Sequence, residues 1–466
     1  MAGGSRHRLL TNAVAGTTQT VASGLMLVVL YRLLLDGVGS TGLGQWSLLV
    51  ALFGLARLLE FGLTGSGMKL TAEALAEGRF GDARCLTRIA ILGTALTTLL
   101  SSLLLAVAIP MLAEVSTATV WELLAIGVGT WVGFLVQALR SSIDAMQRVD
   151  LRHLTITLQA LIMLVLCWFL IPSHGWTGLV AAYLLCSCAT ALLTSVILWW
   201  LWRKIPQEGR LGSIWALLKR VMEYGVPFHL TTISAQFYDP VTKYFLSVFG
   251  TLADVGWYEM ASRMVLQLRG LLISAMEALV PYVAGITLVD RAKGIGEVYF
   301  PAIRMFLVIG VPLFASFLAA IPFIAELWIG TIDQQFVIVS QVLTLAWAVN
   351  VLSAPAYFCA QGQGRQRWNL SGQILIAVAN LALAAVLGQM WGALGVVGAF
   401  CLALVAGSLL LMVGFLRDNR LSISDIGQPG SVAVPAVAAL VGGGLAGSWW
   451  LLPGCHQELQ VAGLVA

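Results

Sequence analysis

Long apolar stretches recur along nearly the whole chain and are separated by short polar connections. A membrane-spanning helix needs about 20 consecutive apolar residues, whereas a strand of a transmembrane barrel shows only about 10 in alternation. The pattern therefore predicts an all-α polytopic membrane protein. The predicted spans are residues 9–35, 43–66, 86–112, 119–142, 151–172, 176–202, 222–249, 254–286, 299–324, 334–360, 369–389, 391–415 and 432–452.

The composition agrees with this pattern. Of 466 residues, 59% are hydrophobic and 10% are charged, and the mean hydropathy is +0.90; a soluble domain carries about 25% charged residues. The net charge of +4 is not concentrated in a basic stripe of a soluble segment, so we predict no binding to nucleic acid. The seven cysteines lack metal-ligand spacing and are typical of small packing residues. We predict no metal site and no cofactor.

The basic residues predict the orientation of the chain. Twenty of the 26 Lys and Arg residues lie at connections on one side of the predicted spans. Such residues gather in cytoplasmic loops. Tryptophans such as Trp46, Trp176 and Trp391 lie at the opposite ends of their spans, as interfacial anchors do. We therefore expect a cytoplasmic amino terminus.

The two halves of the chain resemble each other. A shift of 212 positions aligns Gly44 with Gly256 and Arg57 with Arg269. The repeat predicts two six-helix lobes related by a pseudo-two-fold axis along the membrane normal. The predicted domains are the N-terminal lobe (1–202), a cytoplasmic linker (203–220), the C-terminal lobe (221–416), and an extra C-terminal helix with a tail (417–466).

The seventh predicted span has one polar face. A sector of about 80° on the helical wheel holds His229, Thr232, Gln236, Asp239 and Lys243. Pro240 removes a backbone donor beside these groups, so a kink is expected there. This face predicts a helix that lines a hydrated cavity and bends within the membrane.

Six basic residues lie away from the cytoplasmic connections. Arg32 and Arg304 are close to span ends and can extend to the membrane surface, whereas Arg57, Lys243, Arg263 and Arg269 lie deeper in their predicted spans. An ionised group at the bilayer centre costs at least about 2.5 to 3.5 kcal/mol on insertion scales, so such groups normally face the interior of a bundle or a wet cavity. The predicted cavity therefore carries positive charge.

The same charges have a purely structural interpretation. Asp239 with Lys243 and Glu259 with Arg263 have the i,i+4 spacing of helix ion pairs, and Arg57 with Glu60 has i,i+3 spacing. Such pairs neutralise each other and can serve only to hold helices in register. The sequence leaves both interpretations open.

Two stretches resemble a known family. The segment "YRLLLDGVGSTGLGQWSLLVALFGLARLLEFGLTGSGMKLTAEALAEG", followed by "FGDAR", is similar to the amino-terminal region of bacterial polysaccharide-transporter flippases. These belong to the multidrug, oligosaccharidyl-lipid and polysaccharide exporter superfamily. The segment "YGVPFHLTTISAQFYDPVTKYFLSVFGTLADVGWYEMASRM" resembles the start of their second half.

The resemblance implies a flippase of the bacterial inner membrane whose substrate is an oligosaccharide on polyprenyl pyrophosphate. Membrane lipids and other polysaccharide-assembly membrane proteins are the implied partners. Rocking of the lobes would move the head group from the cytoplasmic to the external side. The predicted substrate-binding residues are Arg57, Arg269, Arg263, Lys243, Gln236, Gln267 and Asn12, and the predicted ion-coupling residues are Asp239, Glu277 and Glu60.

Two other classes compete with a flippase. A drug or metabolite cation antiporter of the same superfamily would favour an acidic, aromatic cavity, although Glu60, Asp239, Glu259 and Glu277 roughly balance the basic set here. A membrane-embedded enzyme would need a sizeable soluble loop, and the sequence offers no phosphate-binding glycine loop or nucleophile constellation. We predict no catalytic residues. The predicted count of thirteen spans departs from the twelve or fourteen of the family.

Overall fold

The computed structural model describes residues 2–112, 119–206, 212–276, 279, 283, 294–422, 435, 437–439 and 441–445. Side chains are described within these ranges except at 2–18, 112, 227–228, 230–235 and 274–275. The described residues form helices and connections and contain no strand. The predicted all-α polytopic membrane fold is confirmed.

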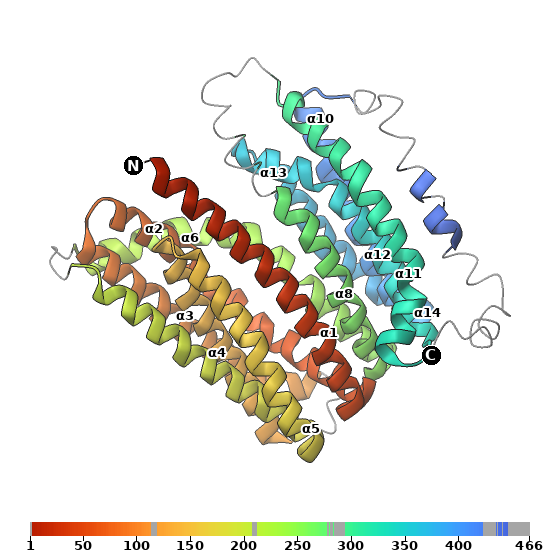
Figure 1. Ribbon diagram of the computed structural model, residues 1–466. Coiled ribbons are helices and arrows are strands. Elements are labelled where there is room, and N and C mark those ends of the chain that lie inside the picture. Colours follow the sequence, from red (N-terminus) through yellow and green to blue (C-terminus); the bar gives the residue numbers. More distant parts are fainter. Residues whose placement is uncertain are drawn as a thin grey trace. The chain divides into compact units, whose positions relative to one another are not determined.

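The helices of Figure 1 follow one another with short connections. They are α1 (Ala2–Gly54), η1 (Leu55–Glu60), α2 (Leu63–Ala76), α3 (Phe80–Leu112), α4 (Val120–Ala145), α5 (Val149–Arg203), α6 (Ile214–Gln236), α7 (Tyr238–Phe249), α8 (Leu252–Met276), α10 (Gly296–Met305), η2 (Phe306–Gly310), α11 (Val311–Ile329), α12 (Gln334–Leu352), α13 (Ala354–Gly362) and α14 (Arg367–Asp418).

Three of these helices are each two spans joined by a tight turn at a glycine. The turns lie at Gly39 in α1, Gly175 in α5 and Gly392 in α14, with φ of 71°, 53° and 59°. A positive φ is easily adopted only without a Cβ atom. In the described part of the chain, seven helices are long and apolar enough to cross a membrane. Three of them hold two predicted spans each, so the seven account for ten.

The seventh and eighth predicted spans differ from these apolar helices. The seventh divides at Phe237 into α6 and α7. Pro240 lies in the first turn of α7, and its ring would clash with the carbonyl four residues earlier, at Gln236, in a continuous helix. The predicted kink is confirmed. The eighth span begins as α8, which carries Asp254, Glu259, Arg263 and Arg269. Of the thirteenth span, residues 435, 437–439 and 441–445 are described, and they are helical.

The second predicted span, 43–66, is not the continuous helix that the sequence predicts. A 3-10 segment, η1, follows α1, and Phe61 and Gly62 then adopt left-handed φ values of 54° and 71° before α2 begins at Leu63. The apolar pattern does not reveal this break, because hydropathy does not report backbone conformation. A carboxylate stabilises it: Glu60 Oε1 accepts a hydrogen bond from the Thr64 amide at 2.9 Å, which satisfies a donor at the start of α2.

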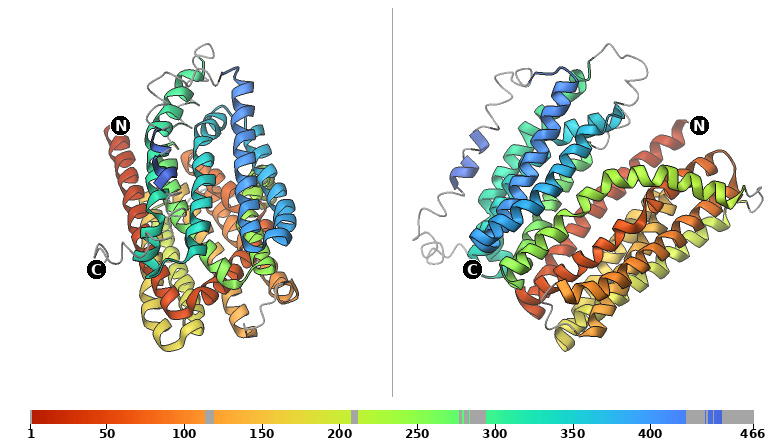
Figure 2. Two further views of the ribbon diagram at one scale, coloured as in Figure 1. Left: turned by 90° about the vertical axis from the view of Figure 1, so that its right-hand side faces the viewer. Right: turned by 180° about the vertical axis from the view of Figure 1, so that it is seen from behind.

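The chain forms two compact units, Met1–Gly256 and Trp257–Ala466. In the first, α2, α3, α4 and α5 pack in sequence, α1 lies along α5, α6 packs on α2 and α3, and α7 packs on α1 (Figure 1). In the second, α12 packs against α11 and α14 (Figure 2). The boundary between the two units follows Gly256, later in the chain than the boundary between the predicted lobes 1–202 and 221–416. The reason is that α6 and α7 pack against helices of the first half. The lobe boundaries themselves stay a prediction.

A close crossing of two backbones involves glycines that the repeat aligns. A Cβ atom on Gly44 would lie 1.6 Å from the Leu252 carbonyl oxygen, and one on Gly256 would lie 2.3 Å from the Ser40 carbonyl oxygen. The shift of 212 positions that relates Gly44 to Gly256 also relates Ser40 to Leu252. The two halves of this contact are therefore equivalent, as a pseudo-two-fold axis requires.

This crossing makes a testable prediction about stability. Alanine favours a helix over glycine by about 1 kcal/mol, but overpacking a tight site costs about 1 to 3 kcal/mol. We expect Gly44→Ala to lower the melting temperature in detergent. Gly133→Ala in α4, where a Cβ atom meets open space, should leave it unchanged or raise it. Equal behaviour of the two variants would contradict the close crossing.

Candidate functional site

The predicted cavity residues occur in both compact units. Met1–Gly256 contains Arg57, Glu60, Gln236, Asp239 and Lys243, and Trp257–Ala466 contains Arg263, Gln267 and Arg269. Two further predictions cannot be placed, because the side chain of Asn12 and the whole of Glu277 lie outside the described residues.

Arg57 and Glu60 form an ion pair at the break in the second span. Arg57 Nε donates to Glu60 Oε2 at 3.1 Å, while the other carboxylate oxygen of Glu60 binds the first turn of α2. The Glu60 side chain is 4% exposed and that of Arg57 is 31% exposed. A helix amino terminus favours a carboxylate, so Glu60 is held by a cation and by a helix end together.

His229 also contacts this break. Its ring Nε2 hydrogen-bonds to the Leu58 carbonyl oxygen at 3.1 Å, and the side chain is buried. Because a carbonyl only accepts, Nε2 carries the proton in this contact. The bond gives the irregular backbone of η1 a partner from α6. This contact gives His229 a structural role inside the protein.

Lys243 and Asp239 pair along one face of α7. Lys243 Nζ lies 2.5 Å from Asp239 Oδ2; the lysine side chain is 2% exposed and the aspartate side chain is 46% exposed. Burying an ammonium group is costly, and the ion pair with Asp239 lowers that cost for Lys243. Gln236 lies half-buried at the end of α6, one turn before Asp239.

Glu259 and Arg263 pair on α8 with the burial reversed. Arg263 Nε donates to Glu259 Oε1 at 2.7 Å. Here the Glu259 side chain is only 5% exposed, while the Arg263 side chain is 46% exposed. Gln267 lies half-buried one turn further along. All three ion pairs that the i,i+3 and i,i+4 spacings predict are therefore formed.

Arg269 has neutral partners instead of a carboxylate. Its Nε donates to Asn350 Oδ1 at 3.1 Å, and its guanidinium carbon lies 4.9 Å from the centroid of the Trp347 ring, within cation–π range. Asn350 Nδ2 in turn donates to Ser408 Oγ on α14 at 2.9 Å. Among the described residues, Arg269 forms no ion pair with a carboxylate.

Sequence reasoning missed Trp347, Asn350 and Ser408. They lie in the tenth and twelfth predicted spans, whose uncharged, apolar pattern gives no sign of a polar site. The one available signal is the i,i+3 spacing of Trp347 and Asn350, which places an aromatic ring and an amide on one helix face. The repeat also misled: Arg57 aligns with Arg269, but Glu60 aligns with Leu272, so the position equivalent to Glu60 offers Arg269 no carboxylate.

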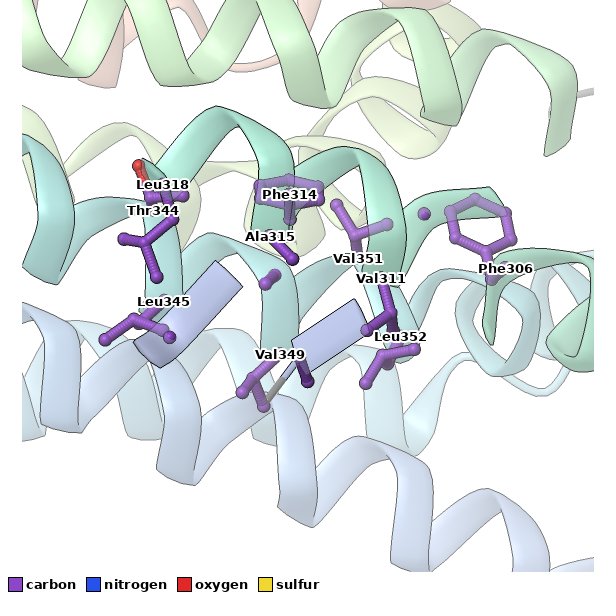
Figure 3. Close-up of a pocket in the computed structure, with 14 residues that line it drawn as sticks. Phe306, Val311, Phe314, Ala315, Leu318, Thr344, Leu345, Val349, Val351 and Leu352 are labelled. Atoms are coloured by element: carbon purple, nitrogen blue, oxygen red, sulfur yellow. The ribbon is translucent and has the colours of Figure 1, made fainter. Parts of the chain in front are cut away.

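An apolar cavity of about 260 Å³ lies elsewhere in the second unit (Figure 3). Its walls come from η2, α11, α12 and the helical residues Ala439 and Gly443, and Thr344 supplies the hydroxyl among the labelled side chains. Such a lining suits hydrocarbon and offers nothing to a charged head group. Within the described residues, no group of three or more His, Cys, Asp or Glu side chains is placed to hold a metal ion.

The sequence matches one protein family over more than half of its length. The profile of the family described as "Polysaccharide biosynthesis protein" matches residues 9–287. No curated protein matches the sequence.

Several solved transporter structures have a similar fold. An inward-facing multidrug resistance MATE family transporter of the MOP superfamily superposes with a TM-score of 0.70 at 15% identity, covering 86% of this chain and 95% of that one. The lipid II flippase MurJ, in an inward closed conformation, superposes with a TM-score of 0.68 at 15% identity, covering 93% of this chain and 98% of that one. The MATE transporter VcmN of Vibrio cholerae, in its bent form, gives 0.54 at 15% identity, covering 86% and 98%.

These similarities are structural, since at such identities they show the fold alone. The family match is independent of them, and it contains the three ion pairs and Arg269. The resemblance stated from the sequence is thereby confirmed. The chain belongs to the polysaccharide biosynthesis protein family and has the fold of the MOP-superfamily transporters.

Proposed function

We propose that the protein flips polyprenyl-pyrophosphate-linked oligosaccharide from the cytoplasmic to the outer leaflet of a bacterial inner membrane, for cell-surface polysaccharide synthesis. It acts as a transporter by alternating access and not as an enzyme. The family and the likeness to a lipid II flippase support this class of cargo. The observation that carries the proposal is Arg269, a guanidinium within α8 whose described partners leave its charge uncancelled.

The chemistry of the cargo fits these groups. A pyrophosphate and a sugar chain cannot cross about 30 Å of hydrocarbon unaided, whereas an arginine binds two phosphate oxygens at once. The amides of Gln236 and Gln267 are suited to sugar hydroxyls, and Asn12 is the third amide of the proposed set. The amino terminus and the basic connections face the cytoplasm, where such lipid-linked sugars are assembled.

A second candidate is a drug or metabolite cation antiporter, favoured by the likeness to MATE transporters. Such a protein needs a carboxylate with room for an organic cation, which is far larger than a coupling proton or sodium ion. Glu60 and Glu259 are buried and bonded to arginines, and the more exposed Asp239 is bonded to Lys243. These pairings leave the cation antiporter as the weaker candidate.

Translocation by purified protein tests the cargo. In proteoliposomes, a fluorescent oligosaccharide on polyprenyl pyrophosphate should move between leaflets with the wild type. We expect Arg269→Ala to slow this movement at least about tenfold, because about 1.4 kcal/mol of lost binding already has that effect. Arg32→Ala is the matched control, since Arg32 is an exposed arginine paired with Asp36, and it should move the lipid at the wild-type rate.

Folded wild type that moves no lipid-linked sugar, but moves organic cations, would replace the flippase with the antiporter. Movement that survives Arg269→Ala unchanged would keep the function and remove Arg269 from it.

Ion coupling at Asp239 generates a separate prediction. Asp239→Asn alone would remove the carboxylate bonded to the buried Lys243 and should destabilise the fold, so the informative variant is the double change Asp239→Asn with Lys243→Met. We expect this variant to fold but to lose the acceleration that an imposed proton or sodium gradient gives the wild type. Wild-type movement that is indifferent to both gradients would exclude a coupling ion at Asp239, Glu60 or Glu277.

A further inference from the structure

We infer that Trp347 and Asn350 are positioning residues that hold Arg269 as the diphosphate-binding group of the cargo site. This inference rests on the proposed function and names the part of the lipid-linked sugar that the second unit recognises. The ligand class is an isoprenoid diphosphate, and the contact is between phosphate oxygens and the Nη edge of Arg269.

Arg269 differs from the other three basic residues of the predicted substrate-binding set. Arg57, Lys243 and Arg263 each bond to a carboxylate within one turn of the same chain segment, at 3.1, 2.5 and 2.7 Å. A phosphate would have to compete with that carboxylate for each of them. Arg269 bonds to an amide oxygen at 3.1 Å, so an arriving anion meets no competitor among the described residues.

The guanidinium of Arg269 keeps one edge for a ligand. It is planar and has five N–H donors in a fixed arrangement. Trp347 packs on its face and Asn350 takes the Nε donor, which leaves the Nη edge without a described protein acceptor. That edge is the one that binds two phosphate oxygens in a bidentate contact.

Asn350 is itself held by hydrogen bonds. Its Nδ2 donates to Ser408 Oγ at 2.9 Å, and Ser408 donates to the Leu404 carbonyl at 2.7 Å within α14. Because the Nδ2 side of the amide is bonded to Ser408, its oxygen faces Arg269. An amide orients the guanidinium without cancelling its charge, whereas an aspartate in the same place would cancel it.

Arg140 shows what a structural arginine without a carboxylate looks like in the same protein. Its Nε donates to Thr155 Oγ1 at 3.0 Å, and its Nη2 donates to the Thr155 carbonyl and to Gln159 Oε1 at 2.9 and 2.8 Å. Those bonds use the Nη side of the group and tie α4 to α5. Arg269 uses only its Nε side on described residues, and this difference indicates a ligand.

The experiment is the isosteric change Asn350→Asp. Binding of farnesyl diphosphate, with farnesol as the uncharged comparison, is measured on protein in nanodiscs. We expect the wild type to bind the diphosphate and Asn350→Asp to weaken that binding at least about tenfold while farnesol binding stays unchanged. The control is Gln334→Glu, which adds the same charge at the exposed first residue of α12, and it should bind as the wild type does.

A second pair of variants keeps the test informative if Asn350→Asp fails to fold. Trp347→Phe retains an aromatic face and should bind the diphosphate within a few-fold of the wild type, whereas Trp347→Ala should weaken binding strongly. If Trp347 had only a structural role, Trp347→Ala would change the binding of farnesyl diphosphate and of farnesol alike, or would change only the melting temperature.

The outcomes separate the inference from the proposed function. If the wild type flips lipid-linked oligosaccharide and folded Asn350→Asp keeps full diphosphate affinity, the inference is wrong and the function stands. If the wild type flips the lipid but does not bind farnesyl diphosphate, the inference is also wrong. If the wild type flips no lipid-linked sugar, the proposed function itself fails.

Discussion

The cost of an ionised group in hydrocarbon constrains every polar feature of this protein. Each charge inside a span needs a partner, a wet surrounding or a ligand, and three basic residues have that partner within a single helical turn. Asp239 accompanies Lys243, Glu259 accompanies Arg263, and Glu60 accompanies Arg57. In the first two pairs one member is buried and the other is more exposed, so the charge is neutralised locally while one polar group of each pair stays accessible.

The same constraint explains the irregular backbone of the second span. Backbone that leaves the helical conformation inside a membrane exposes donors and acceptors that must be satisfied by the protein. Glu60 accepts a hydrogen bond from the amide of Thr64, and His229 hydrogen-bonds to the carbonyl of Leu58. The charges of this region therefore stabilise a helix break as well as each other, and discontinuous helices of this kind occur at the substrate sites of other transporters.

Arg269 departs from this local pairing, and in the described part of the chain its partners are neutral groups. An indole face and an amide oxygen stabilise the guanidinium, and neither removes its net charge. The amide depends on Ser408 in α14, so the polar chain joins α8, α12 and α14. Packing of α12 against α14 in the second unit is what makes this arrangement possible.

Periodicity and charge along the chain determined the all-α membrane fold, most span positions, the kink near Pro240 and the three ion pairs, because each of these depends on residues within a few positions of one another. The sequence also indicated the glycine pair at the close crossing through the repeat. Only the tertiary structure decided that the second span breaks at Phe61 and that Arg269 meets Trp347, Asn350 and Ser408. Arg269 and Asn350 are 81 positions apart in the sequence, and Asn350 and Ser408 are 58 positions apart. The hydropathy of α12 and α14 does not indicate these contacts, since the partner of an amide or a hydroxyl in an apolar helix depends on which helix packs against it.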